Sequence, residues 1–341
     1  MTPTTYSDLE REGYRIRPAR MDDLEEAVEM FNRCARVMTG RPEFTLDRYR
    51  TEWQAPGFDL DQDTRILLSP DDQIVGCVEV WTVSDPPVHP WVWARVHPEW
   101  EGRGIGTAMI HWGKTRAMEA TFNRVPEENR IAMYCGTVGT HEPSKLLLEG
   151  LGMSLIRQSY RMRIDFNEPI PSASWPDGLS VRTYNHTEDG EAVFRAQDEA
   201  FKDHWGYVET PFDQAYERWL HFNVHQDGFD PSLWFLAMDG EEIAGMSLCK
   251  HRAEDEAEIG WVSVLCVRRP WRNKGIGLAL LHHSFAVLRD RGKQGVGLGV
   301  DAENLTGATR LYERAGMHVD RNFLTYGLEL RPGRELSKQT P

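Results

Sequence analysis

The feature that most constrains this chain of 341 residues is an internal repeat. The segment Val96-His-Pro-Glu-Trp-Glu-Gly-Arg-Gly-Ile-Gly106 returns as Val267-Arg-Arg-Pro-Trp-Arg-Asn-Lys-Gly-Ile-Gly277, with the same spacing of valine, tryptophan and glycines. Two further pairs of short segments keep the same order along the chain: Ile16-Arg17 with Val181-Arg182, and Gly152-Met153 with Gly316-Met317. Three shared anchors in one order predict two copies of a single domain.

The repeat also indicates where the domains begin and end. Between the copies, Asp165-Phe-Asn-Glu-Pro-Ile-Pro-Ser-Ala-Ser-Trp-Pro-Asp-Gly178 is rich in proline and small polar residues, which is typical of an extended linker. We therefore expect an N-terminal domain at residues 1–168, a linker at 169–178, a C-terminal domain at 179–332 and a tail at 333–341.

Each half has the pattern of strands alternating with helices. A hydrophobic strand runs into the glycine turn, a long apolar helix follows, and a second buried strand comes next. The predicted elements are Trp91–Val96, Gly104–Glu119 and Arg130–Cys135 in the first half, and Glu258–Val267, Gly275–Arg291 and Gly295–Val300 in the second. The fold class predicted for each half is α/β, with helices against a mixed sheet.

Composition excludes several classes of protein. With 53 acidic and 39 basic residues, the formal charge of −14 lacks the basic footprint of a nucleic-acid or anionic-membrane binder. Five scattered cysteines without a C-x-x-C pair indicate neither a disulfide framework nor a thiolate zinc site, so we expect no metal. Because the sequence also lacks an apolar run of about 18 residues, we expect a cytoplasmic protein without membrane partners.

The second glycine turn has the residue types of an anion site. In Arg272-Asn-Lys-Gly-Ile-Gly277, successive backbone N–H groups and the positive end of the following helix can cradle a pyrophosphate. A glycine turn that only caps the helix is the alternative. The Rossmann fingerprint is excluded because Leu280 stands where its third glycine would be, and the P-loop G-K-[ST] is also missing.

The context of this turn resembles the GNAT superfamily of N-acetyltransferases. The shared features are a hydrophobic strand ending at Leu265-Cys-Val267, the R-x-x-G-x-G turn, a helix, a strand and Leu311-Tyr-Glu-Arg-Ala-Gly-Met317. The resemblance covers both halves and implies two tandem GNAT-like acyl-CoA N-acyltransferase domains. In that family the turn binds the pyrophosphate of acetyl-CoA, and the strand before it binds the pantetheine through its main chain. The cofactor-binding residues so implied are Leu265, Cys266, Val267, Arg272, Asn273, Lys274, Gly275, Ile276, Gly277, Leu278 and Asn304.

The resemblance also implies catalytic residues. Tyr312 matches the family tyrosine that acts as general acid toward the CoA thiolate; the alternative is a packed aromatic side chain. For the general base, Asp301 is one candidate, Glu303 is another, and a water molecule is a third. We assign no chemistry to the Cys266 thiol, because no His and acid are placed to activate it.

The two halves differ in the residues that carry this chemistry. Glu101 stands where the second half has Arg272, and Leu148 stands where it has Tyr312. A carboxylate at the turn disfavours an anionic ligand, and a leucine provides no proton. We therefore predict that the C-terminal half is catalytic and that the N-terminal half is a degenerate scaffold.

The segment Phe201-Lys-Asp-His-Trp-Gly-Tyr207 lies where family members often form the acceptor wall. It makes Asp203 and His204 candidates for substrate binding, although packing or helix capping would also explain these residue types. The tandem arrangement is similar to that of the mycothiol synthases. The strand glutamate of those enzymes, expected at about Trp261, is absent here, so their substrate is not carried over.

The sequence thus predicts an N-acetyltransferase that moves an acetyl group from acetyl-CoA to a primary amine of an acceptor that it does not identify, by direct attack in a ternary complex. The acceptor classes left open are antibiotic, polyamine, amino-sugar and protein N-terminal amines, and we expect a small molecule. The alternative from another class is a non-catalytic acyl-CoA-binding sensor or interaction protein. A hydride-transfer enzyme is disfavoured because the dinucleotide fingerprint fails. Since two fused copies can supply the pseudo-twofold arrangement of a dimer, we expect a monomer.

Overall fold

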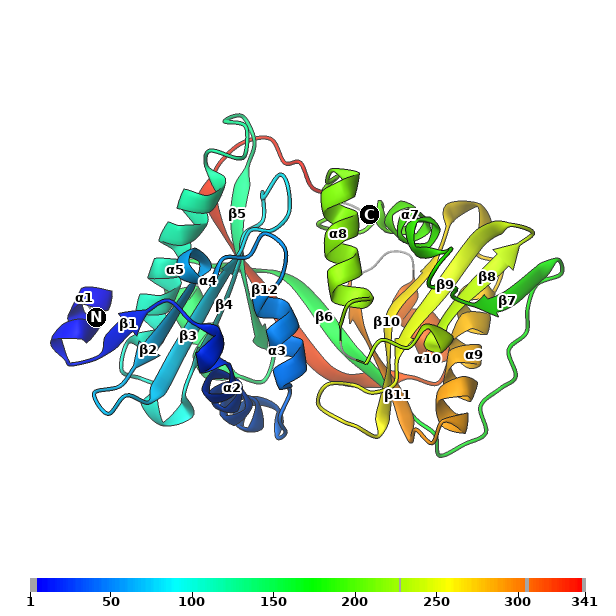
Figure 1. Ribbon diagram of the computed structural model, residues 1–341, viewed down its shortest axis with the longest axis horizontal. Coiled ribbons are helices and arrows are strands. Elements are labelled where there is room, and N and C mark those ends of the chain that lie inside the picture. Colours follow the sequence, from blue (N-terminus) through cyan, green and yellow to red (C-terminus); the bar gives the residue numbers. More distant parts are fainter. Residues whose placement is uncertain (1–4, 227, 304–306, 339–341) are drawn as a thin grey trace. The chain divides into compact units, whose positions relative to one another are not determined.

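The computed structural model describes residues 5–226, 228–303 and 307–338. They divide into two compact units (Figure 1). Unit 1 takes its described residues from the ranges 1–157, 208–226 and 323–337, and unit 2 from 158–207, 227–322 and 338–341. Compact units and sequence repeats therefore do not coincide, because each unit contains segments from both halves of the chain.

Unit 1 is built around strands in the order β1-β2-β3-β4-β5-β12. Neighbouring strands are antiparallel except for the parallel pair β4 and β5. The strands are β1 (Arg15–Arg17), β2 (Thr64–Leu68), β3 (Ile74–Trp81), β4 (Trp91–Val96), β5 (Ile131–Val138) and β12 (His318–Arg331), whose residues from 323 onward belong to this unit. The helices are α1 (Tyr6–Arg11), α2 (Leu24–Thr39), α3 (Leu46–Trp53), α4 (Leu60–Asp63), α5 (Ile105–Thr121), α6 (Glu142–Gly150) and α8 (Phe212–Asn223), with short 3-10 turns at Met21–Asp23 and Pro98–Trp100.

Unit 2 repeats this plan with strands in the order β7-β8-β9-β10-β11-β6. Its one parallel pair is β10 and β11. The strands are β7 (Leu179–Thr183), β8 (Trp234–Asp239), β9 (Glu242–Lys250), β10 (Ile259–Val267), β11 (Gly295–Asp301) and β6 (Ser154–Asp165), whose residues from 158 onward belong to this unit. The helices are α7 (Gly190–Phe201), α9 (Ile276–Asp290) and α10 (Ala308–Arg314), with 3-10 turns at Pro231–Leu233 and Arg269–Trp271. The predicted mixed α/β class is confirmed in both units.

The last strand of each sheet comes from the other half of the sequence. In unit 1, β12 from the end of the chain pairs with β5. In unit 2, β6 from the first half pairs with β11. The two copies have thus exchanged their closing strands.

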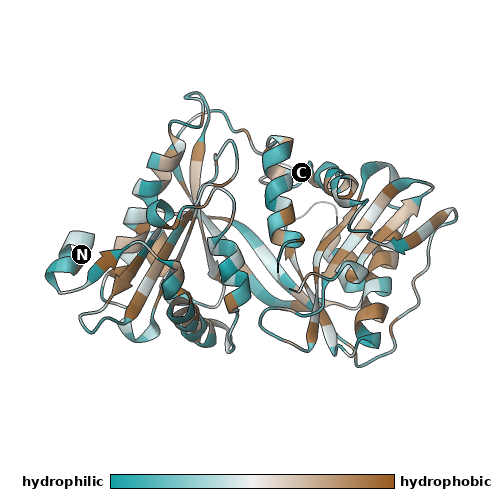
Figure 2. Ribbon diagram, in the orientation of Figure 1, coloured by the Kyte–Doolittle hydropathy of each residue, from teal (hydrophilic) through white to brown (hydrophobic). Residues whose placement is uncertain are grey.

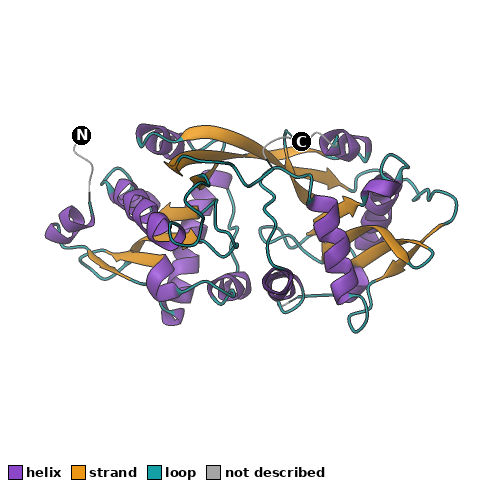
Figure 3. Ribbon diagram, turned by 90° about the horizontal axis from the view of Figure 1, so that it is seen from above, coloured by secondary structure: helices purple, strands orange, loops and turns teal. Residues whose placement is uncertain are grey.

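Alternating residues place cores on both faces of the strands of unit 1. In β2, Leu67 packs into the cluster beneath α5, whereas Ile66 and Leu68 pack into the cluster beneath α2, as the period of two in a strand requires. Figure 2 shows hydrophobic residues gathered on the central strands of each unit, and Figure 3 shows helices on both sides of them. Among the described residues, no helix combines the length and the apolar character that crossing a membrane needs.

Candidate functional site

Strands β10 and β11 of unit 2 separate halfway along their length. Their parallel pairing covers Ile259–Val262 and Gly295–Leu298 only. Beyond that point β10 continues to pair with β9, and β11 with β6. The edge of β10 over residues 263–267 therefore has no strand partner toward β11 among the described residues, and its backbone N–H and C=O groups need other partners. Leu265, Cys266 and Val267, the predicted main-chain binders, lie on this edge.

A β-bulge marks the point of separation. Val262 is opposite Cys249 and Val264 is opposite Leu248, so Ser263 is an extra residue, and its side chain is exposed. After the bulge, Leu265 packs against the same core as Val262, although the two are three residues apart. The bulge thus resets the alternation of side chains and re-aims the backbone of the strand. Sequence analysis missed it, because the run from Val262 to Val267 carries no marker of an unpaired residue.

The glycine turn after β10 has the backbone of an anion cradle. Asn273 and Gly275 both adopt left-handed conformations, with φ of 63° and 86°, and Gly275 is the N-cap of the 15-residue helix α9. A Cβ placed on Gly275 would meet nothing within 4 Å, so the space beside the helix N-terminus is open. Such an end offers N–H groups and partial positive charge to an anionic group.

The arginine of the motif points into the protein. Arg272 donates from Nε to the Val267 carbonyl at 3.1 Å, from Nη2 to the Ala200 carbonyl at 3.0 Å and from Nη1 to the Asp203 carboxylate at 3.0 Å. Asp203 also accepts hydrogen bonds from Arg269. The Arg269 and Arg272 side chains hold the pKa of Asp203 well below its usual range. Arg272 and Asp203 thus fasten the turn to the end of α7, and Lys274 is the exposed cation of the turn.

Tyr312 lies on α10 next to this strand and turn. Gly277 lets α9 and α10 approach closely, since a Cβ there would stand 3.0 Å from the Leu311 side chain. Tyr312 is only 7% exposed. Burial, followed by the nearby Cys266 thiol on β10, raises the pKa of Tyr312 to about 12, so the phenol keeps its proton at neutral pH. Burial likewise raises the pKa of Cys266 to about 12, which leaves the thiol protonated and unreactive.

Asp301 ends β11 and interacts electrostatically with His204, 97 residues earlier in the chain. Burial and then the Arg272 charge lower the pKa of His204, whereas the Asp301 carboxylate acts in the opposite direction. The imidazole is therefore neutral at pH 7. Glu303, the other candidate base, donates its backbone N–H to the Asp301 carboxylate at 3.0 Å. Asn304, the remaining predicted residue, lies outside the described residues.

Unit 1 has the same kind of glycine turn, but different side chains surround it. A cavity of about 1760 Å³ lies between β4, the turn and α6, with Gly104, Gly106, Glu101 and His141 in its lining. The Glu101 carboxylate lies 3.8 Å from the His141 imidazole. Leu148, at the place of Tyr312, is buried in the core. The space for a ligand is thus retained in unit 1, although the hydroxyl and the arginine are not.

Comparison with known proteins adds a family to this geometry. The profile described as "Acetyltransferase (GNAT) family" matches twice, at residues 24–136 and 191–317. A mycothiol acetyltransferase of Thermobispora bispora is 31% identical over 254 residues, which is 74% of this chain and 79% of the relative. The mycothiol acetyltransferase of Streptomyces avermitilis is 29% identical over 310 residues, 89% of this chain and 91% of the relative.

Two solved structures share the architecture over nearly the whole chain. A GCN5-related N-acetyltransferase from Sphaerobacter thermophilus has a TM-score of 0.78 and 30% identity, and the match covers 97% of this chain and 99% of that one. A tandem GNAT protein from the clavulanic acid biosynthesis pathway has a TM-score of 0.69, with 94% and 99% covered. At 14% identity, the second match shows the fold alone. These findings confirm the predicted tandem domains and the predicted class of enzyme.

Proposed function

Because the chain belongs to the acetyltransferase (GNAT) family and is an acetyl-CoA-dependent N-acetyltransferase, we propose that its C-terminal half carries the reaction, by direct attack of a primary amine on acetyl-CoA. The observation that supports this most is the separation of β10 from β11, with Tyr312 beside β10 and Asp301 at the end of β11. An acid and a base candidate thus flank one gap in the sheet.

The residues around this gap fit acetyl-CoA. The turn at residues 272–278 offers backbone N–H groups to the pyrophosphate, and Lys274 adds an exposed positive charge. The edge of β10 that β11 leaves unpaired at residues 265–267 can bind the amide groups of the pantetheine as a neighbouring strand would, except at the Val267 carbonyl, which accepts from Arg272. Arg272 keeps the turn in place from behind.

The chemistry requires one bond to form and one to break. The amine nitrogen bonds to the thioester carbonyl carbon, the carbon–sulfur bond breaks, and the sulfur departs as CoA thiolate. The nitrogen must lose a proton, and we assign the role of proton acceptor to Asp301, which interacts electrostatically with the neutral His204. The thiolate gains a proton, which we assign to the Tyr312 hydroxyl.

Tyr312 suits the leaving group as a hydrogen-bond donor. With a pKa of about 12, its phenol is a weaker acid than a free thiol, whose pKa is about 8.5. Full proton transfer in one step is therefore uphill, and a charge-assisted hydrogen bond to the developing thiolate provides most of the stabilisation. The Tyr312 proton passes to the thiolate as CoA leaves, and the phenolate regains a proton from solvent before the next turnover.

The acceptor is proposed as a small molecule with a primary amine. Two relatives of this chain are named mycothiol acetyltransferases, which supports a small acceptor. However, Trp261 stands at about the place where a strand glutamate is expected in those enzymes. Their substrate is therefore one member of the panel to be tested.

Release of free thiol from acetyl-CoA, measured with a thiol reagent against a panel of primary amines, tests this function. We expect release that depends on the amine and saturates with it. Tight binding of acetyl-CoA by calorimetry, without amine-dependent release from any member of the panel, would refute the proposed reaction. It would favour the non-catalytic acyl-CoA sensor instead.

A further inference from the structure

One face of unit 2 next to the gap carries an unusual row of side chains. The strand register places Trp261 beside Gly297, Gly297 beside Arg163, and Gly299 beside Arg161. Because residues two apart in a strand share a face, Gly297, Gly299 and Asp301 all point to this side. The intervening residues of β11, Val296, Leu298 and Val300, are buried on the other side against α9.

The indole of Trp261 lies across this face. It covers Gly297 so closely that a Cβ there would stand 2.8 Å from Cζ3 of the ring. The Arg161 guanidinium on β6 lies 5.3 Å from the centroid of the same ring. The indole thus spans from β10 across β11 to β6, and part of its surface remains exposed.

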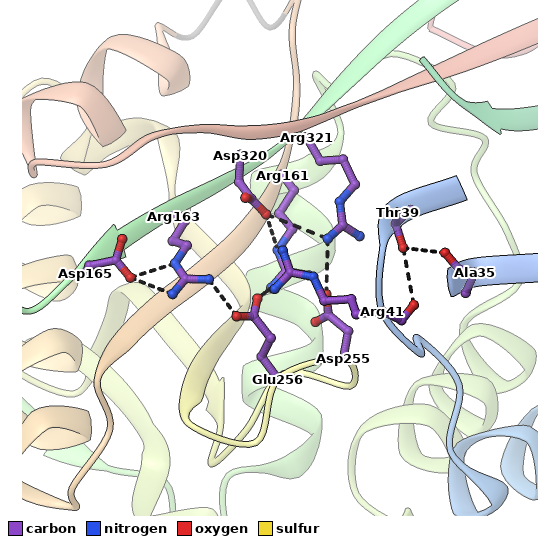
Figure 4. A network of polar contacts seen from close by, with 10 residues as sticks. All are labelled: Ala35, Thr39, Arg41, Arg161, Arg163, Asp165, Asp255, Glu256, Asp320 and Arg321. Atoms are coloured by element: carbon purple, nitrogen blue, oxygen red, sulfur yellow. Dashed lines mark hydrogen bonds and ion pairs between the residues drawn. The ribbon is translucent and has the colours of Figure 1, made fainter. Parts of the chain in front are cut away.

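Arg161 is held by a network of ion pairs and is only 6% exposed (Figure 4). Its guanidinium pairs with Asp255, with Glu256 at 2.9 Å and with Asp320 at 3.2 Å. Arg321 pairs in turn with Asp255. Because surrounding carboxylates neutralise it, Arg161 has little charge to offer a ligand, and its effect is to fix the position of the indole.

Gly299 leaves an open space between this indole and the candidate base. It is exposed, and a Cβ built on it meets nothing within 4 Å. Gly299 is also the first residue of β11 beyond the pairing with β10, so the space opens at the gap itself. An aromatic wall lies on one side of it, and Asp301, two residues along the same face, lies on the other.

We propose that this space over Gly299 is the subsite for the body of the acceptor, with Trp261 as its wall, and that it selects primary amines that carry an apolar ring. The inference rests on the proposed function. A ring placed over Gly299 contacts the exposed part of the indole, and its amine then lies toward Asp301 and His204. A side chain at position 299 would occupy the same space.

The sharpest test is Gly299→Val, because the φ of Gly299 lies outside the left-handed region and the added side chain meets open space. We expect the KM for benzylamine to rise about tenfold. The KM for methylamine should change less than twofold, and the dissociation constant of acetyl-CoA should not change. Trp261→Phe removes part of the wall without a large cavity. Like Gly299→Val, it should lower the ratio of kcat/KM for benzylamine over that for propylamine.

Trp91→Phe is the matched control. In unit 1 the Trp91 indole covers Gly136, where a Cβ would lie 2.9 Å from the ring, so this variant loses the same kind of contact away from the proposed site. It should leave the amine preference unchanged. The subsite is overturned if wild type does not prefer benzylamine to propylamine, or if neither Gly299→Val nor Trp261→Phe moves that ratio more than twofold.

Calorimetry separates this inference from the proposed function. Benzylamine is titrated into the protein saturated with CoA, which needs no turnover. If no amine releases thiol but benzylamine binds wild type and not Gly299→Val, the subsite is correct and the reaction is wrong. If benzylamine binds both proteins equally, the subsite is wrong whatever the reaction.

Discussion

The glycine turns of the two halves have nearly the same backbone although their side chains differ. Gly104 and Gly275 cap their helices with φ of 79° and 86°. At Gly106 and Gly277, an added Cβ would stand 2.9 and 3.0 Å from a leucine of the following short helix. The turn and its contact with the short helix have thus been kept in both halves, which indicates that they serve the fold.

The side chains around the two turns differ in their charge and in the direction in which they point. Arg272 faces inward and fastens its turn to α7. Glu101 at the same position instead lies near His141 at the lining of the cavity in unit 1. A carboxylate there repels a polyphosphate, so similar backbones provide different electrostatic environments.

The strands that lead into the turns differ as well. β4 pairs with β3 without a register shift, whereas β10 has the bulge at Ser263. Counting back three residues from the last valine of each strand places Trp93 at the position of Val264. Trp93 belongs to a group of aromatic rings whose neighbouring centroids lie 4.8 to 5.9 Å apart, with Phe31, Phe44 and Tyr49. Unit 1 thus has a cluster of packed rings around a position where unit 2 has a buried valine.

The largest expected effect on catalysis comes from Tyr312→Phe. Without the hydroxyl, the leaving thiolate loses its donor, and we expect kcat to fall about 10³-fold. Stopped assays of thiol release at saturating acetyl-CoA measure it, and calorimetry should show unchanged acetyl-CoA binding. Tyr326→Phe is the control, because it removes a tyrosine hydroxyl that donates to Glu149 at 2.9 Å in unit 1. Equal losses in both variants would contradict a catalytic role for Tyr312.

Asp301→Asn should come next, with kcat lower by about 10²-fold because the attacking amine loses its proton acceptor. Initial rates of thiol release at saturating acetyl-CoA and amine measure the loss. Glu303→Gln is the matched variant, since it removes one carboxylate two residues away. A loss in Glu303→Gln alone would move the assignment to Glu303, and full activity in both variants would point to water.

The pair Gly275→Ala and Gly104→Ala compares the turns directly. Both glycines are left-handed and have free space around a Cβ, so each alanine should lower the free energy of unfolding by about 1 kcal/mol. Only Gly275→Ala should raise the KM for acetyl-CoA, by about tenfold, because its methyl group would stand where the pyrophosphate approaches. Urea unfolding and initial rates measure the two effects. An equal rise in KM for Gly104→Ala would place ligand binding that matters for turnover in unit 1.

The sequence was sufficient for features that depend on local pattern. The glycines and the apolar period predicted a helix over Gly275–Arg291, and α9 runs from Ile276 to Asp290. The repeat predicted two similar folds, because duplicated residues specify duplicated elements. Tyr312 was proposed from the resemblance of Leu311-Tyr-Glu-Arg-Ala-Gly-Met317 to the family, and the structure adds that its side chain is buried, with the Cys266 thiol of β10 nearby.

Features that depend on distant parts of the chain were not predictable in the same way. Exchange of β6 and β12 leaves both strands with equivalent pairing, so no residue pattern distinguishes it from the unexchanged arrangement. The inward direction of Arg272 depends on Asp203, 69 residues away. The space over Gly299 depends on where an indole from another strand lies.

Among these substitutions, Glu79→Gln should have the smallest effect on catalysis, although the Glu79 side chain matters for stability. Glu79 on β3 is 1% exposed and accepts hydrogen bonds from the indoles of Trp53 and Trp81 at 2.8 and 3.0 Å. Burial raises the pKa of Glu79 to about 7. At the matching register position of β9 stands Leu248, which does not titrate, so this pH dependence belongs to unit 1 alone.

The direction in which Glu79 makes stability depend on pH follows from its raised pKa. The folded state binds the proton of Glu79 more tightly than the unfolded state does, so its contribution is fully present below about pH 4.5 and is lost as the pH rises toward 7. Raising the pH from 5 to 8 should therefore lower the free energy of unfolding of wild type by roughly 2 kcal/mol relative to that of Glu79→Gln. Urea unfolding at the two pH values measures the difference, and kcat of the variant at pH 7 should equal that of wild type. A loss of turnover in Glu79→Gln would show that unit 1 takes part in the reaction, and the division between the two halves would have to be redrawn.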